Sequence, residues 1–355
     1  MAHDLPPPSY RPFGAFRFVL ASTVLLQHGL VLLAPPDREV FYDLELGAVA
    51  VVAFFALSGF IVAEATQNFY TGRPAAFLVN RVLRVVPPYL AALVITIAAD
   101  AWLYSRGILQ PLVGTLHGSP LQPRVIAAAI LEIVPGLPAI RISGQDFSFV
   151  PFAWTLRMEF AFYLAAFATC FVARHRRVGR SAGLIAFAAA YGAFWVFVLR
   201  GGQGPLQIVC VPFFAFGVGV FLFGRAPGIA AAAHLGFALG CSLLAFTYFR
   251  QHGHPIVAFQ LGLTTVLFEL ILVLSRLTAK PGRLRSWDRR LGGLSYPLYI
   301  SHGVVLTVLG SLSDRRGALS YALAIIVALL LAAGLHIVVE QPLRALRTRV
   351  RRVSL

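Results

Sequence analysis

The chain has 355 residues, of which 58% are hydrophobic and only 12% are charged, and its mean hydropathy is +0.78. Soluble domains carry about a quarter charged residues, so this composition excludes a soluble globular protein and indicates an all-α integral membrane protein. The net charge of +16 does not indicate nucleic-acid binding, because the basic residues, all arginine except Lys280, form short clusters between apolar segments.

Ten apolar segments are predicted to cross the membrane as a helical bundle. They are residues 13–34, 44–66, 85–104, 151–173, 182–199, 206–224, 229–249, 255–275, 292–312 and 319–340. A hydrocarbon core needs a helix of about 20 residues, and these segments have that length. An eleventh stretch, 125–140, is shorter and contains Pro135 and Pro138, so we expect it not to cross.

The distribution of basic residues predicts that both termini are cytoplasmic. With ten spans, 21 basic residues lie inside and eight outside, as the positive-inside rule requires. Residues 105–150 then form one long external loop with room for a re-entrant or surface helix. Residues 343–355 form a basic cytoplasmic tail that touches anionic membrane lipid. No linker divides the chain, which predicts a single domain over 1–355.

The first predicted span contains two ionisable residues, Arg17 and His28, eleven positions apart. At 100° and 1.5 Å per residue, both project from one helix face and stand about 16 Å apart. Arg17 then lies near the cytoplasmic surface and His28 deep in the outer half. Ionisable groups at such depth indicate function, and histidine suits general-base work near neutral pH. Alternatively, His28 bonds to another helix while Arg17 reaches the lipid headgroups.

The second span contains Ser58 and Gly59 among large apolar residues, followed by Glu64. Small residues favour close helix packing, and the alternative is a role for the Ser58 hydroxyl in a site. Glu64 lies at the predicted level of Arg17, so we expect an ion pair between them.

Before the third span, Arg81 and Arg84 are three residues apart and share a helix face. Pro87 and Pro88 are typical of a helix's first turn, where no amide donor is needed. A helix N-terminus beside two guanidinium groups would suit a phosphate-bearing ligand on the cytoplasmic side. The alternative is ordinary anchoring at the inner surface.

Further polar residues occur in the fourth and ninth spans. Glu159 enters about 12 Å deep, near the depth of His28, where a carboxylate could orient the imidazole or else form a structural pair with arginine. Tyr296, Tyr299 and His302 recur every three residues and fall on one stripe. An aromatic belt at the interface accounts for Tyr296 but not for His302, which falls near the middle of the membrane.

These motifs occur in a characteristic order along the chain. They read R-x10-H in the first span, FF-x-LSGF in the second, R-x-x-R-V-x-P-x-Y before the third, W-x-L-x-x-E in the fourth and SY-x-x-Y-x-x-H in the ninth. From Arg17 to about Pro342, this order resembles the membrane-bound acyltransferase family 3, a group of bacterial integral-membrane O-acyltransferases.

The resemblance implies transfer of an acyl group, commonly acetyl, from acyl-CoA to a hydroxyl of a carbohydrate or other small acceptor. It implies a multi-pass protein of the bacterial cytoplasmic membrane with acyl-CoA as co-substrate and no bound cofactor or metal. His28 matches the family's essential histidine, Arg17 its paired arginine, and Arg81 and Arg84 its R-x-x-R pair. Ser301 departs from the pattern, because the family often has Trp there.

We therefore expect His28 to act as general base, or as a transient acyl carrier, with Glu159 as its catalytic partner. Arg17, Arg81 and Arg84 are expected to hold the donor's phosphates. The expected supporting residues are Ser58, Glu64, Tyr296, Tyr299 and His302. In this interpretation the Arg17–His28 spacing matches the reach of the pantetheine arm.

A rival interpretation is a transporter or flippase that uses the same intramembrane charges as a permeation path. Transporters usually show repeated halves and helices broken at matching positions, and the sequence shows neither. A sensor or scaffold would leave the face shared by Arg17 and His28 without a purpose.

Overall fold

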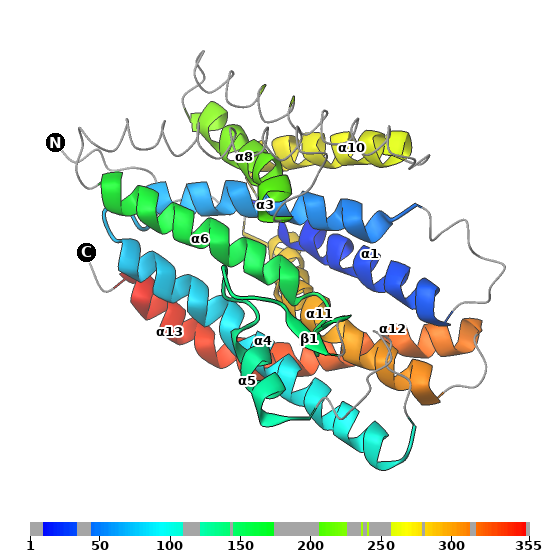
Figure 1. Cartoon of the computed structure of the whole chain (residues 1–355). Helices are drawn as coiled ribbons and strands as arrows, with labels where there is room; N and C mark the ends of the chain where they lie inside the picture. Colours follow the sequence, from blue (N-terminus) through cyan, green and yellow to red (C-terminus); the bar gives the residue numbers. More distant parts are fainter. Residues whose placement is uncertain are drawn as a thin grey trace. The chain divides into compact units, whose positions relative to one another are not determined.

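The structure is a computed structural model, and it describes residues 10–33, 44–108, 121–142, 145–173, 206–225, 257–278, 281–312 and 317–352, with 236 and 240. These residues are mainly helical (Figure 1). The helices are α1 (Gly14–Leu33), α3 (Leu46–Asn68), α4 (Pro74–Ser105), α5 (Pro123–Leu131), α6 (Ala153–Ala173), α8 (Leu206–Arg225), α10 (Val257–Arg276), α11 (Arg283–Leu312), α12 (Ala318–Leu335) and α13 (Gln341–Arg352). A π-helical segment, η2 (His336–Glu340), joins α12 to α13.

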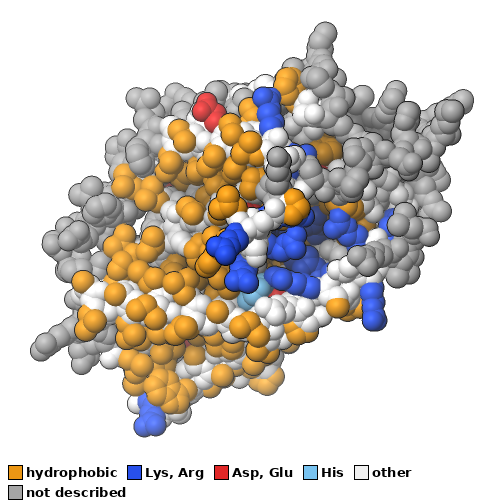
Figure 2. All heavy atoms as spheres, turned by 180° about the vertical axis from the view of Figure 1, so that it is seen from behind, with side chains coloured by type: hydrophobic (Ala, Val, Ile, Leu, Met, Phe, Trp, Pro, Cys, Tyr) orange, Lys and Arg blue, Asp and Glu red, His pale blue; other side chains and the backbone are white. Residues whose placement is uncertain are grey.

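A helix lies at eight of the ten predicted spans. Of the other two, 182–199 falls outside the described residues, and in 229–249 only residues 236 and 240 are described. Within the described part, three helices are long and apolar enough to cross a membrane: α3, α4 and the continuous helix over 318–351. Large apolar side chains such as Val94 and Leu330 are exposed, and orange apolar surface covers much of the view in Figure 2. Such surface fits a lipid environment, and the count of ten spans stays a prediction.

Helix α4 begins at Pro74, so Pro87 and Pro88 lie inside it. The prediction that these prolines open the helix was therefore wrong. Apolar helices tolerate internal proline where neighbouring groups satisfy the backbone. The two prolines remove the amide donors to the carbonyl oxygens of Leu83 and Arg84, and at the next residue the Tyr296 hydroxyl, from α11, donates to the carbonyl oxygen of Val85 at 2.8 Å.

The described residues form two compact units, each assembled from separate stretches of chain. The first comprises Met1–Leu20, Ala48–Phe77 and Ala165–Gly293, and the second comprises Ala21–Gly47, Leu78–Leu164 and Leu294–Leu355. Helices α1, α4, α6 and α11 each continue from one unit into the other. No single cut in the sequence separates the units.

In the first unit, a buried carboxylate from α11 caps the start of α1. Asp288 Oδ2 accepts from the Gly14 amide at 3.0 Å, and Oδ1 accepts from the Ala15 amide at 2.7 Å. Tyr10 donates its hydroxyl to the same carboxylate, and Arg285 lies over its ring. A negative group at a helix N-terminus satisfies free amides and complements the helix dipole. Burial, together with Asp288, raises the pKa of Tyr10 to about 12, which keeps this hydroxyl a donor.

Helices α3 and α8, also in the first unit, approach through glycine. A Cβ on Gly59 would lie 2.1 Å from the Phe214 carbonyl oxygen, and one on Gly217 would lie 1.8 Å from the Ala56 carbonyl oxygen. The Phe55 and Phe214 rings contact each other beside this point, with centroids 4.8 Å apart and ring planes tilted by 31°. The geometry favours close packing as the reason for the small residues in α3.

Replacing Gly217 with Ala should destabilise the protein by about 1–3 kcal/mol, because the added methyl meets backbone that cannot yield without moving a helix. Gly224→Ala is the matched control on the same helix, since a Cβ there meets nothing within 4 Å. Thermal unfolding in detergent measures both. Equal melting temperatures for the two variants would contradict the packing argument.

In the second unit, residues of the predicted external loop form a short helix and a β-hairpin. Helix α5 has 9 residues, about 14 Å, which is too short to span a hydrocarbon core. Strand β1 (Ile140–Ile142) pairs antiparallel with β2 (Gln145–Phe147), so the chain is not wholly α-helical as predicted. Arg141 and Asp146, which face each other at the middle of the two strands, form an exposed ion pair 3.0 Å apart.

Glu132 connects α5 to the rest of this loop. Its carboxylate accepts from the Ser148 hydroxyl at 2.9 Å, and its backbone carbonyl accepts from Arg157 Nε at 2.8 Å. Burial raises the pKa of Glu132 to about 7, against opposing effects of the Ser148 hydrogen bond and the Arg157 charge. The folded loop therefore binds this proton more tightly than the unfolded loop does.

We expect the stability of this loop to fall as pH rises from about 4.5 to about 7, because the folded state must give up a proton that it holds more tightly. Hydrogen exchange over 132–150, corrected for the intrinsic pH dependence of exchange, measures this. In Glu132→Gln the pH dependence should disappear, since an amide does not titrate in this range. A loss of protection toward low pH instead would refute the assignment.

Candidate functional site

The site is centred on a pair of histidines in the second unit, one from α1 and one from α11. His28 Nδ1 lies 3.0 Å from His302 Nε2, and the two ring planes differ by 7°. The side chain of His28 is half-buried, whereas His302 is 0% exposed. The pair therefore joins a ring within reach of a ligand to one wholly enclosed by protein.

Phe152, directly before α6, covers one side of both imidazoles. Its ring centroid lies 4.6 Å from that of His28 and 4.2 Å from that of His302, with interplanar angles of 16° and 20°. Gly303 permits this contact, because a Cβ at that position would lie 3.0 Å from the Phe152 ring. Phe152 was not among the expected site residues, although it lies in the predicted fourth span, two residues before the W-x-L-x-x-E motif.

The second ring nitrogen of His302 is held by its own helix. His302 Nδ1 lies 2.8 Å from the Tyr299 carbonyl oxygen and 3.2 Å from that of Leu298. The Tyr299 hydroxyl in turn lies 2.9 Å from Thr155 Oγ1 on α6. Two of the expected supporting residues, Tyr299 and His302, thus lie together beside His28.

Glu159 belongs to a different set of contacts. It hydrogen-bonds to the Tyr163 hydroxyl on the same helix, and the Arg81 guanidinium lies over the Tyr163 ring at 5.5 Å. The hydrogen-bonded partner of His28 is His302. A role for Glu159 in orienting His28 stays a prediction.

The three arginines expected at the donor phosphates are divided between the two units. Arg81 and Arg84 lie inside α4, seven and ten residues after its start at Pro74, so neither is at a helix N-terminus. The part of the phosphate argument that used a helix N-terminus is therefore wrong. Arg17 packs in the first unit beside Gly292, where an added Cβ would lie 2.7 Å from its guanidinium. The three-arginine site remains a prediction.

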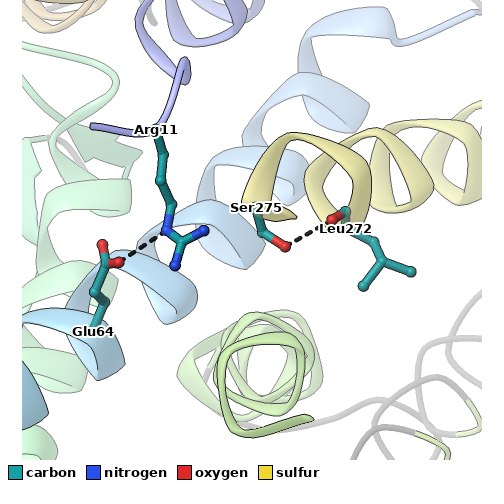
Figure 3. A network of polar contacts seen from close by, with 4 residues as sticks. All are labelled: Arg11, Glu64, Leu272 and Ser275. Atoms are coloured by element: carbon teal, nitrogen blue, oxygen red, sulfur yellow. Dashed lines mark hydrogen bonds and ion pairs between the residues drawn. The ribbon is translucent and has the colours of Figure 1, made fainter. Parts of the chain in front are cut away.

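Glu64 and Ser58 belong to the first unit. Glu64 Oε1 pairs with Arg11 Nε at 2.9 Å, so its partner is Arg11 where the sequence suggested Arg17 (Figure 3). In the same view, Ser275 donates to the Leu272 carbonyl of its own helix, a common solution for a hydroxyl in apolar surroundings. A site role for Ser58 stays a prediction.

Among the described residues, no group of three or more His, Cys, Asp or Glu side chains could hold a metal ion. What the histidine pair offers is proton transfer. An imidazole hydrogen-bonded through one nitrogen keeps the other for a substrate proton, the arrangement in which a base is oriented by a third group.

Comparison with known proteins gives one family and several relatives. A family model described as an acyltransferase domain, acyltransferase family 3, matches residues 13–337. Nodulation protein 10 of Rhizobium leguminosarum bv. viciae is 26% identical over 381 aligned positions, which cover 96% of each chain. The O-acetyl transferase of Shigella phage Sf6 is 23% identical over 163 positions, or 43% of each chain.

A third relative, protein 2 in the picA locus of Rhizobium radiobacter, is 36% identical over 117 positions, covering 31% of this chain and 60% of its own. No solved structure matches the chain. Because the family model covers nearly the whole chain and contains both histidines of the pair, the chain belongs to acyltransferase family 3 and is an acyltransferase.

Proposed function

We propose that the protein is an O-acyltransferase of the bacterial cytoplasmic membrane. It moves an acyl group, acetyl in the simplest case, from acyl-CoA to a hydroxyl of a carbohydrate or other small acceptor. Family membership supports acyl transfer, and the relative named as an O-acetyl transferase supports a hydroxyl acceptor. The observation that carries the proposal is the half-buried His28, hydrogen-bonded at one ring nitrogen and set in apolar surroundings.

In the proposed reaction, the unbonded ring nitrogen of His28 takes the proton of the acceptor hydroxyl as its oxygen attacks the thioester carbonyl. The tetrahedral intermediate then collapses, the C–S bond breaks, and the proton on His28 passes to the departing CoA sulfur. The products are the acyl ester and CoA with a free thiol, and His28 returns to its neutral form.

The surroundings of His28 suit the charge that forms on it. When His28 holds the proton, it is a cation facing the Phe152 ring at 4.6 Å, within the range of a cation–π attraction. His302 Nε2, 3.0 Å away, is a partner for the Nδ1 proton of that cation. Both contacts favour the imidazolium that general-base catalysis produces.

No feature of the described residues favours a transporter or flippase over an O-acyltransferase. The polar atoms around His28 are engaged in a compact hydrogen-bonded set, and Phe152 closes one side of it. A permeation path would need a series of polar groups along the membrane normal, whereas these groups are arranged around one ring nitrogen.

Replacing His28 with Ala should lower acyl transfer by about 10²- to 10⁴-fold or more, because the base is lost while donor and acceptor can still bind. Purified protein in detergent, given acetyl-CoA and an acceptor glycan, allows release of free CoA to be measured. Leu26→Ala, an exposed position on the same helix, is the matched control and should retain activity. Parent-like activity in the His28 variant would remove His28 from the site.

The donor site is tested best at Arg84. Arg81 is only 6% exposed and packs on Tyr163, so its loss would disturb folding, whereas Arg84 is partly exposed. Arg84→Gln should raise KM for acetyl-CoA about tenfold with little change in kcat, as the loss of one charge-assisted phosphate contact predicts. Arg141→Gln, which removes an exposed charge from the hairpin, is the control. An unchanged KM in Arg84→Gln would exclude Arg84 from donor binding.

A further inference from the structure

We propose that His302 is a positioning residue that fixes the tautomer of His28, so that Nε2 of His28 is the atom that receives the acceptor's proton. This inference rests on the proposed function of His28 as general base. It assigns His302 a specific task and names the reactive atom, which the motif pattern alone does not do.

The assignment begins at the carbonyl oxygen of Tyr299. A carbonyl oxygen can only accept, and His302 Nδ1 lies 2.8 Å from it, with the Leu298 carbonyl oxygen at 3.2 Å. His302 Nδ1 must therefore carry a hydrogen and donate it. A lone pair facing two carbonyl oxygens inside a fully buried environment would be repelled by both.

The rest follows from the chemistry of neutral imidazole, in which one nitrogen is a donor and the other an acceptor. With its hydrogen on Nδ1, His302 presents a lone pair at Nε2. His28 Nδ1, 3.0 Å away, must then be the donor of their mutual hydrogen bond. The remaining nitrogen of His28, Nε2, is left with the lone pair, which makes it the basic atom.

The alternative arrangement, a doubly protonated His302, would place a full charge on a side chain that is 0% exposed. Burying an ion is far more costly than burying a neutral ring whose two nitrogens are both hydrogen-bonded. With both rings neutral, the hydrogen bonds from His28 to His302 and from His302 to the Tyr299 carbonyl give a partner to both nitrogens of His302 and to Nδ1 of His28.

Packing favours the ring orientations that the hydrogen bonds between His28, His302 and the Tyr299 carbonyl require. The imidazoles differ by 7° in orientation, and Phe152 lies nearly parallel to both, at 16° and 20°. The N–H of one imidazole and the lone pair of the other lie in their ring planes, so nearly parallel rings suit a hydrogen bond between the two nitrogens. Neither ring can turn about its long axis without leaving the Phe152 face.

The same bond gains strength during the reaction. Once His28 Nε2 has taken the acceptor's proton, its Nδ1–H becomes a charge-assisted donor to His302 Nε2. The stabilisation is therefore larger in the charged intermediate than in the resting enzyme, which is the condition for an interaction to raise kcat. His302 does this without touching the substrate.

The test uses two variants of His302 that both carry a side-chain amide, on a longer side chain in glutamine and a shorter one in asparagine. In His302→Gln the amide oxygen stands where His302 Nε2 stood and can accept from His28, whereas in His302→Asn the shorter amide can bond only the backbone carbonyls. With acetyl-CoA and an acceptor glycan, we expect kcat within about tenfold of the parent for Gln and about 100-fold lower for Asn. KM for acetyl-CoA should be unchanged in both, and melting temperatures report folding.

Equal kcat values for the Asn and Gln variants, whether high or low, would overturn the positioning role. A second measurement needs no substitution at His302. Ring-nitrogen NMR shifts of ¹⁵N-labelled protein, with the His28 signals assigned by their absence in His28→Ala, should show hydrogen on Nδ1 and a lone pair on Nε2, and the reverse would overturn the assignment. If instead His28→Ala stays active, the proposed function fails, whatever the tautomer.

Discussion

The hydrogen bond between His28 and His302 is the interaction on which the candidate site depends. It lies where water cannot readily replace a missing partner, so each ring nitrogen that it uses must be satisfied by protein. One end of the chain of contacts is a backbone carbonyl of α11, and the other is the half-buried ring of α1. Gly303 leaves room for the Phe152 ring, since a Cβ there would lie 3.0 Å from it. Among the described residues, Nδ1 of His28 and both ring nitrogens of His302 thus contact neutral groups, a second imidazole or a backbone carbonyl.

Hydropathy located the helices well, because the cost of exposing polar backbone in lipid leaves little choice of structure for a long apolar segment. The bounds of α1, α3 and α6 differ from prediction by at most two residues. The starts of α4 and α11 were predicted eleven and nine residues too late. Hydropathy detects only the apolar part of a helix, and the first turns of α4 and α11, which it missed, contain several arginines. Pro87 and Pro88 were a second reason for the late predicted start of α4, because they are typical of a first turn but lie inside this helix.

The candidate site could be predicted one helix at a time but not across helices. Periodicity along α1 singled out His28, and the stripe along α11 singled out His302. Their pairing joins positions 274 residues apart, and depth alone suggested Glu159 instead. Depth gives the level of a residue in the membrane and says nothing of the direction in which it faces. The hairpin at 140–147 had a local signal, because Ser143-Gly144 between two short runs is typical of a tight turn.

The cap on α1 has a consequence for the order in which the protein can be completed. The amides of Gly14 and Ala15 are made at the beginning of synthesis, but the carboxylate that accepts from them belongs to Asp288, more than 270 residues later. His302, which contacts His28, is likewise made 274 residues after it, and Tyr321, whose hydroxyl donates to the Leu26 carbonyl, is made 295 residues after Leu26. These polar groups of α1 therefore gain these particular partners only when α11 and α12 have been made. A nascent chain that stops before α11 holds His28 without the His302 ring that contacts it, so the candidate site is complete only once α11 has been made.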